Sequence, residues 1–255
     1  MGVGTRLAKR FVESLRSNGT STTLRLCAKT LAHEARSYLD RRFDRRFGVD
    51  TSGRVDLAGL SIGSPNAELG VYYEPTSVLA FRSLIRRLAF PPSGWTFLDI
   101  GSGKGRTLFL AADYPFRKII GVEFAKDLHD IAVMNAERYR SPSQQCAVFE
   151  LNHMDAVDFK MPQEPLVVFL FNPFERPVME RVARNAAEAI KASGQDMVVI
   201  YHNALKREIF ESLGCFPEVV PVKLPYDFTR EHQRPAVIFS TRPGLVQRDI
   251  SQTSK

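Results

Sequence analysis

Short apolar runs alternate along most of the chain with segments whose apolar residues recur every three or four positions. Runs of this kind predict buried strands, and the segments between them predict helices. The predicted strands are 96–100, 118–122, 146–150, 166–171, 197–201, 218–224 and 236–240. The predicted helices between them are 107–112, a segment around 128–135, 178–190 and 205–213. Such alternation indicates an α/β domain with a parallel sheet covered on both faces.

The first 47 residues show the helical period without strands. Leu7, Phe11 and Leu15 lie four positions apart, and Asn18-Gly19 interrupts the pattern. A second apolar face follows at helical spacing, formed by Leu24, Cys27, Leu31, Ala35 and Leu39. The segment closes at 41–47 with arginines and interleaved phenylalanines. We expect a basic amphipathic helical extension over 1–47. It either packs its apolar face on the main domain or presents its charges to phosphates, an anionic membrane surface or an acidic protein.

The remaining chain divides by composition. Residues 48–70 are rich in Gly, Ser, Asn and Asp and predict a linker. The main domain is predicted over 71–242, beginning with a short helix that Pro91-Pro92 ends. The apolar face of this helix is Val78, Phe81, Leu84, Ile85 and Leu88. Residues 243–255 predict a polar tail with frayed structure.

Charge is concentrated at one end of the chain. The formal net charge is +7, and residues 1–50 carry eleven Lys/Arg against five Asp/Glu, a balance of +6. The main domain is therefore almost neutral, and any attraction to a polyanion is expected in the N-terminal extension.

The cysteines and the hydropathy of the chain indicate the cellular compartment of the protein. The three cysteines, Cys27, Cys146 and Cys215, are scattered without metal-ligand spacing, which favours reduced thiols over a disulfide framework or a zinc site. No apolar run reaches the length of a membrane span, and no secretory signal is evident. We expect a cytoplasmic protein.

The strongest chemical signal is the segment 97–106, FLDIGSGKGR, in which a predicted strand ends in an acid and opens into glycines. Glycines at the carboxyl end of a strand let the backbone turn sharply and approach a ligand closely. The phosphate-loop pattern GxxxxGK[ST] is not matched. The dinucleotide pattern GxGxxG is not matched either, because the third glycine falls one residue early. The spacing favours a nucleoside with a thioether arm, although a helix N-terminus there would also suit a pyrophosphate.

Two acids follow the glycine loop at the ends of later strands. Glu123 ends the second strand about twenty residues on, where a carboxylate is placed to accept both ribose hydroxyls. Asp155 follows the third strand and is placed either to accept from an adenine amine or to cap a turn. Both nucleoside roles leave the identity of the cofactor open.

These motifs together resemble those of class I S-adenosylmethionine-dependent methyltransferases, over about residues 70–240. The resemblance rests on DIGSGKG, on the GVE and MDA segments, and on Asn172-Pro173-Phe174 after the fourth strand. The segment 73–76, YEPT, is similar to the YxPT element of some bacterial members and of a lysine-methylating branch. The DxGSGxG pattern with the acid that follows it also resembles the non-SET histone lysine methyltransferases. The resemblance implies a Rossmann-like, doubly wound, seven-stranded sheet with an antiparallel last strand, preceded here by the N-terminal helical extension.

The resemblance also implies roles for individual residues, with S-adenosyl-L-methionine as cofactor. The expected cofactor-binding residues are Tyr73, Thr76, Asp99, Gly101, Gly103, Gly105, Glu123, Asp155 and Asn172. The expected catalytic residues are Asn172, which would orient a target amine, and Phe174, which would pack over the methyl or a planar group. The motif lacks one proline of the Asn-Pro-Pro-Tyr/Phe pattern, which argues against base-flipping DNA methylation. His202, as a general base, and Glu74, near the acceptor, are further candidates, and no residue cluster indicates a metal.

We therefore expect methyl transfer to an amine of a protein or small molecule. Two other classes stay open. An NAD-type oxidoreductase is disfavoured by the glycine spacing. A non-catalytic nucleic-acid-binding module would use the basic N-terminal helices and lose binding steeply with salt. A related aminopropyl transfer is also open, although no acidic polyamine-binding series is evident. The sequence does not identify the methyl acceptor.

Overall fold

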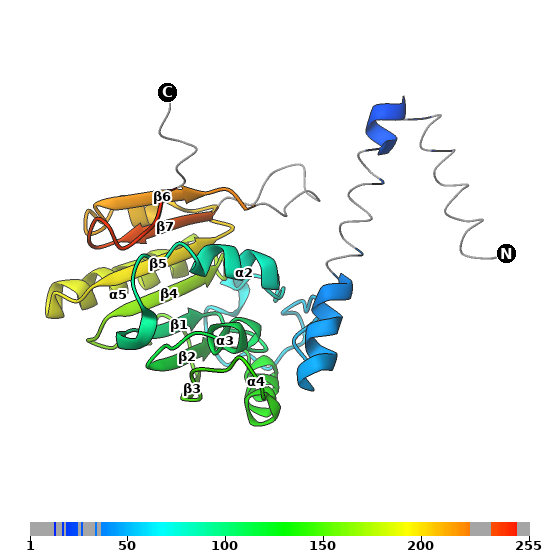
Figure 1. The fold of residues 1–255 in the computed structure, drawn as a ribbon, viewed down its shortest axis with the longest axis horizontal. Helices are drawn as coiled ribbons and strands as arrows, with labels where there is room; N and C mark the ends of the chain where they lie inside the picture. Colours follow the sequence, from blue (N-terminus) through cyan, green and yellow to red (C-terminus); the bar gives the residue numbers. More distant parts are fainter. Residues whose placement is uncertain are drawn as a thin grey trace.

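The computed structural model of the protein describes residues 13, 17, 19–24, 27, 34, 37–224 and 236–248. Within them, one seven-stranded sheet has the strand order β3-β2-β1-β4-β5-β7-β6 (Figure 1). The strands are β1 Thr96–Ile100, β2 Lys118–Glu123, β3 Phe149–His153, β4 Leu166–Phe171, β5 Met197–His202, β6 Glu218–Val222 and β7 Ala236–Ser240. Strands β1 to β5 pair in parallel, and β7 runs antiparallel to β5 and β6. The expected fold class is confirmed.

The connections of the sheet diverge at β1. This strand lies in the middle, between β2 and β4, so that successive crossovers leave it in opposite directions. Ligands of such sheets bind beyond the carboxyl ends of the strands at this switch point. The glycine loop follows β1 and therefore stands at the predicted place.

Helices cover both faces of the sheet. They are α2 Val78–Ile85, α3 Arg106–Ala111, α4 Lys126–Arg138, α5 Arg176–Ser193 and α6 Glu208–Glu211. Along each strand the side chains alternate between two cores: Phe97 packs with α2 and α3, and Leu98 packs with α5 and α6. Helix α5 has a proline in its first turn and ends at Gly194, whose φ of 68° suits a left-handed cap.

The third strand differs from the prediction by three residues. The sequence predicts 146–150, whereas β3 pairs with β2 from Phe149 onward. The reason is that the Cys146 N–H donates instead to the carbonyl of Ala112 at the end of α3, at 3.1 Å, and the thiol is buried there. The local apolar pattern does not distinguish a strand from a loop that packs on a helix.

The N-terminal extension packs through a different face from the one predicted. Residues 37–47 form a helix (Figure 1) in which Phe43 is buried and Phe47 lies 5.1 Å from the Tyr139 ring. Leu24 and Leu39 of the predicted apolar face are 63% and 42% exposed. The phenylalanines lie one turn apart and carry more apolar surface than the predicted leucines. Cys27 of the predicted apolar face is partly buried, and the remaining predicted apolar positions Leu7, Phe11, Leu15, Leu31 and Ala35 lie outside the described residues.

Two further segments are more ordered than the sequence indicates. Leu245 and Val246, in the predicted frayed tail, are buried, and Val246 bridges to Leu88 after α2. The predicted linker continues into the following segment as one packed layer, residues 48–76, which we call the cover. Its short 3₁₀ helix Ala67–Leu69 and its bridges to Ala125 and Phe174 fix it over the carboxyl ends of the strands. Among the described residues, no helix has the length and apolarity needed to span a membrane.

Candidate active site

The glycine loop gives the site its shape. Gly101, Gly103 and Gly105 have φ angles of 80°, 52° and 87°, in the region that only glycine enters at low cost. A Cβ on Gly101 would lie 2.6 Å from Pro173, and one on Gly103 would lie 2.2 Å from the Tyr73 ring. Gly105 instead begins α3 and packs on that helix. The first two glycines therefore permit close approach across the site, and the third permits the turn into the helix.

Two buried carboxyl groups stand beside this loop. Glu123, at the end of β2, accepts hydrogen bonds from the N–H of Gly103 at 2.7 Å and of Ala125 at 2.9 Å. Burial raises its pKa to about 7 in spite of these donors. Burial likewise raises the pKa of Asp99, at β1, to about 8, with the charge of Glu123 as a further cause and a hydrogen bond from Thr107 opposing it. A bound ligand that donates hydrogen bonds to these two carboxyl groups would therefore favour their ionised forms.

A cleft of about 560 Å³, counting its open part, lies between the sheet ends and the cover. Its lining includes six of the residues expected at the site from the sequence: Tyr73, Thr76, Asp99, Gly101, Glu123 and Phe174. Gly103 lies directly beneath the Tyr73 ring. The structure therefore brings together residues that are up to a hundred positions apart in the sequence.

Asp155 is not among the residues that line this cleft. Its carboxylate accepts from the Ser64 hydroxyl, from the Asn66 amide at 2.9 Å and from the N–H of Val157 at 2.9 Å. It both caps its own turn and holds the cover in place. The contact with Asn66 is one that the local sequence did not reveal.

A smaller hollow of about 240 Å³ adjoins the cleft and shares part of its wall. Its lining is Val71, Tyr72, Glu74, Phe171, Asn172 and Asn203. Asn172 and Asn203, with φ of 42° and 55°, are the non-glycine residues with positive φ in the described part of the chain. Such conformations are costly and concentrate at functional sites. The Tyr201 hydroxyl donates to Oδ1 of Asn172 at 2.9 Å and fixes the orientation of this buried amide.

The other catalytic candidates lie at different places. Phe174 lines the main cleft, where its ring meets Phe124 edge-on at 6.0 Å, and it does not line the smaller hollow. His202 is buried, with its ring stacked on Phe171 at 4.2 Å. Glu74 lines both the cleft and the hollow.

Sequence reasoning missed Arg106, which is 1% exposed and lines the cleft. Its guanidinium pairs with Asp40 at 2.9 Å and with Asp44 at 3.2 Å, on the inner side of helix 37–47, and lies 4.5 Å from the centre of the Phe43 ring. Asp44 also accepts from the backbone and the hydroxyl of Thr51. The available signal was the spacing of Asp40 and Asp44, two acids one helical turn apart inside an arginine-rich run.

The chain matches no protein-family profile. It is 33% identical over 93 residues to the histone-lysine N-methyltransferase specific for H3 lysine 79 of Dictyostelium discoideum, a match that covers 33% of this chain and 5% of that protein.

Three solved structures resemble the fold at low sequence identity. A proposed RNA methyltransferase of Pyrococcus horikoshii has a TM-score of 0.49 at 15% identity, over 72% of this chain and 93% of that one. The precorrin-6y C5,15-methyltransferase of Geobacter metallireducens has a TM-score of 0.47 at 15% identity, with the same coverage, 72% and 93%. The glycopeptide N-methyltransferase MtfA in complex with sinefungin has a TM-score of 0.48 at 10% identity, over 66% and 87% of the two chains.

Proposed function

We propose that this protein is an S-adenosylmethionine-dependent methyltransferase that acts on an amine. The observation that carries the proposal is the Glu123 carboxylate, held by two backbone N–H groups at the end of β2 and facing the same cleft as Asp99 and Gly101. Each carboxylate oxygen retains a lone pair with which to accept a ribose hydroxyl. The methyltransferases among the similar proteins support the same class.

The residues of the cleft fit this cofactor. Glu123 would hold the ribose, and Asp99 and the glycine loop would hold the methionine portion, where a Cβ on Gly101 would collide with Pro173. Tyr73 and Thr76, from the cover, would close the pocket from the other side. Phe174 would form a wall of the cofactor cleft. When bound, the cofactor supplies a methyl group on a sulfonium, which an in-line nucleophile accepts.

The smaller hollow would hold the acceptor. Oδ1 of Asn172 has a second lone pair beside the one that Tyr201 uses, so it can accept one N–H of a neutral amine and leave the nitrogen lone pair for the reaction. The Glu74 carboxylate in the same wall would attract an amine in its protonated form before the proton leaves.

Calorimetry on the purified chain tests the cofactor. We expect S-adenosylmethionine and S-adenosylhomocysteine to bind and NAD, as the control, not to bind. Binding of NAD alone would move the protein to the oxidoreductases. Binding of none of the three would contradict the assignment of the cleft.

Asn172→Ala tests the acceptor side, with labelled methyl donor and a panel of amines. We expect cofactor affinity to be retained and turnover to fall by about 100-fold, because the amine loses its orienting acceptor. Tyr201→Phe is the matched variant: it keeps Asn172 but removes its anchor, and a smaller loss is expected. Unchanged turnover in Asn172→Ala would remove this residue from the mechanism.

A further inference from the structure

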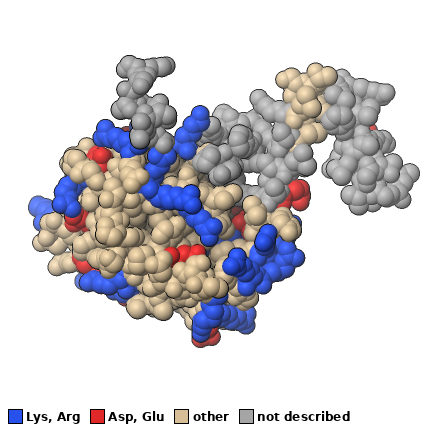
Figure 2. Space-filling view, viewed as in Figure 1, with Lys and Arg blue, Asp and Glu red and all other residues tan. Residues whose placement is uncertain are grey.

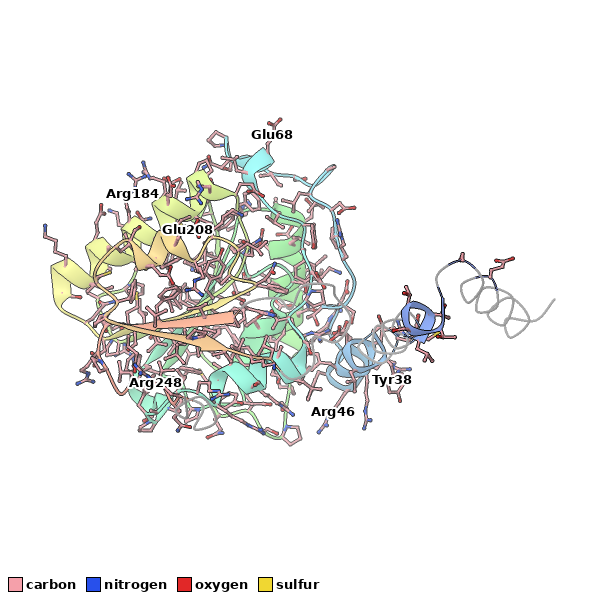
Figure 3. The ribbon with its side chains drawn as sticks, turned by 90° about the horizontal axis from the view of Figure 1, so that it is seen from above. Tyr38, Arg46, Glu68, Arg184, Glu208 and Arg248 are labelled. Carbon is pink, nitrogen blue, oxygen red and sulfur yellow. The ribbon has the colours of Figure 1, made fainter. Side chains whose placement is uncertain are left out.

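Helix 37–47 has two faces of opposite chemistry. On the face towards the domain, Asp40 and Asp44 pair with Arg106. Phe43 stacks on Tyr139 on the same side. The outward face, which we call the arginine face, consists of exposed residues that a helix of 3.6 residues per turn places on one side: Tyr38, Leu39, Arg41, Arg42, Arg45 and Arg46. Figure 3 shows Tyr38 and Arg46 on this outward side of the helix. Both acids of the helix point inward, so the outward face carries positive charge alone.

The positive charge continues onto neighbouring elements. Figure 2 shows Lys and Arg gathered over this helix and over α2 on the same face of the molecule. Arg82 and Arg86 of this region are exposed. Both Arg46 and Arg82 lie close enough to Tyr139 to act on its hydroxyl electrostatically. Asp113 is an acid of this region and lies 3.7 Å from Arg82.

A broad hollow of about 980 Å³, counting its open part, lies beside Tyr139 at the end of α4. Arg140, Gln144 and Gln145 contribute cationic and amide donors to its lining. The side chains of these three residues also donate to the backbone carbonyls of Tyr139, Cys146 and Asp113. The ring of Phe47, from helix 37–47, lies 5.1 Å from Tyr139, so this helix packs beside a residue that lines the hollow.

We propose that the arginine face and this hollow bind single-stranded nucleic acid. Arginine presents a planar fork of donors that matches phosphate oxygens, and an aromatic side chain beside such charges offers a platform on which a base can stack. Tyr38, 52% exposed, is placed for that role. A membrane surface is disfavoured because the phenylalanines of the helix are turned into the protein, which leaves Leu39 as the aliphatic side chain on the arginine face. This binding does not depend on the proposed methyl transfer.

The test is binding of a fluorescein-labelled 20-nucleotide oligouridine RNA to the full chain, followed by anisotropy from 50 to 300 mM salt. The triple variant Arg41→Glu, Arg42→Glu, Arg45→Glu should weaken binding at least 10-fold and reduce the slope of log affinity against log salt by about 2. Arg46 is left intact because its guanidinium lies over the Phe47 ring at 5.3 Å and supports the helix. The control triple on the opposite face of the sheet, Arg181→Glu, Arg184→Glu, Lys191→Glu in α5, changes the charge equally and should bind like the unaltered chain.

Tyr38→Ala separates stacking from charge: it should weaken binding several-fold without changing the salt slope. Retained S-adenosylhomocysteine binding and an unchanged melting temperature show that a variant is folded, whatever its RNA affinity. Absence of RNA binding at 50 mM salt, or equal losses in the two triple variants, would overturn the proposal. Tighter binding of a DNA duplex of the same length, or displacement of the RNA by polyglutamate at equal charge, would overturn it in favour of a duplex or an acidic protein.

Discussion

The floor and the cover of the cleft are built in different ways. The floor consists of strand ends and the turns that follow them, where Asp99, Gly101 and Glu123 are placed by the sheet itself. The cover, residues 48–76, contains no strand of the sheet and is held by polar side chains from distant parts of the chain, such as Arg106, which donates to the hydroxyls of Thr51 and Ser52. The comparison shows that one cleft can combine a rigid half, set by backbone pairing, with a half whose position depends on a few buried polar contacts.

Substitution of Arg106 should give the largest difference in stability between the floor and the cover. In Arg106→Ala, Asp40 and Asp44 lose the guanidinium with which they pair and stay largely buried. We expect the free energy of unfolding, from urea titration, to fall by about 3–5 kcal/mol. Hydrogen exchange should accelerate in the cover and in helix 37–47 and stay slow in β1 and β2.

Lys126→Ala is the control for Arg106→Ala, because Lys126 pairs with Asp130 at an exposed position on α4. Its loss should cost about 0.5 kcal/mol or less. If Arg106→Ala were no more destabilising than this control, or if exchange rose equally in floor and cover, the buried contacts of Arg106 would not be what anchors the cover.

The same division explains what the sequence could predict. Strand β1, its acid and the glycines that follow are contiguous, so that local pattern predicts the floor residue by residue. The cover depends on pairs such as Arg106 with Thr51 and Asn66 with Asp155, which are far apart in sequence and leave no periodic signal. Residues 48–70 therefore resemble a linker in composition although they pack as a layer. Asn172 was predicted from its motif, whereas Asn203, at the end of β5, has none.

Floor and cover meet at Gly103, and the second largest expected effect is the loss of cofactor affinity in Gly103→Ala. A Cβ there would lie 2.2 Å from the Tyr73 ring, on a backbone with a φ of 52°. Either the ring or the loop must move, and we expect affinity for S-adenosylhomocysteine, from calorimetry, to fall by about 100-fold, equivalent to ~2.7 kcal/mol. Gly94→Ala is the matched control, because its Cβ would meet open space without a positive φ. Equal affinities of the two variants would mean that Tyr73 does not close the cofactor pocket.

The smallest expected effect is the pH dependence that the Glu123 carboxyl group gives to stability and to cofactor binding. The pKa of Glu123 is about 7 in the folded protein, above its ordinary value of 4.5. Between these values the unfolded chain has lost the proton that the folded chain keeps, so this group makes stability fall as pH rises from about 4.5 to 7. Ribose hydroxyls donate to the ionised form, so binding of the cofactor should lower the pKa of Glu123 and release protons near pH 6.5. Below pH 7, cofactor affinity should therefore rise with pH, by up to about 10-fold per pH unit.

Calorimetry at pH 6.5 in two buffers of different ionisation enthalpy measures this proton release. Glu123→Gln cannot ionise, and it should bind more weakly and lose its share of the released protons. Asp99→Asn is the companion variant, since the pKa of Asp99 is also raised, to about 8, and part of the release belongs to it. Proton release that is identical in the unaltered chain and in Glu123→Gln would place the ribose away from Glu123. If proton release falls in Glu123→Gln but not in Asp99→Asn, the group that titrates on binding is Glu123. Its carboxylate is held at the end of β2 by the N–H groups of Gly103 and Ala125.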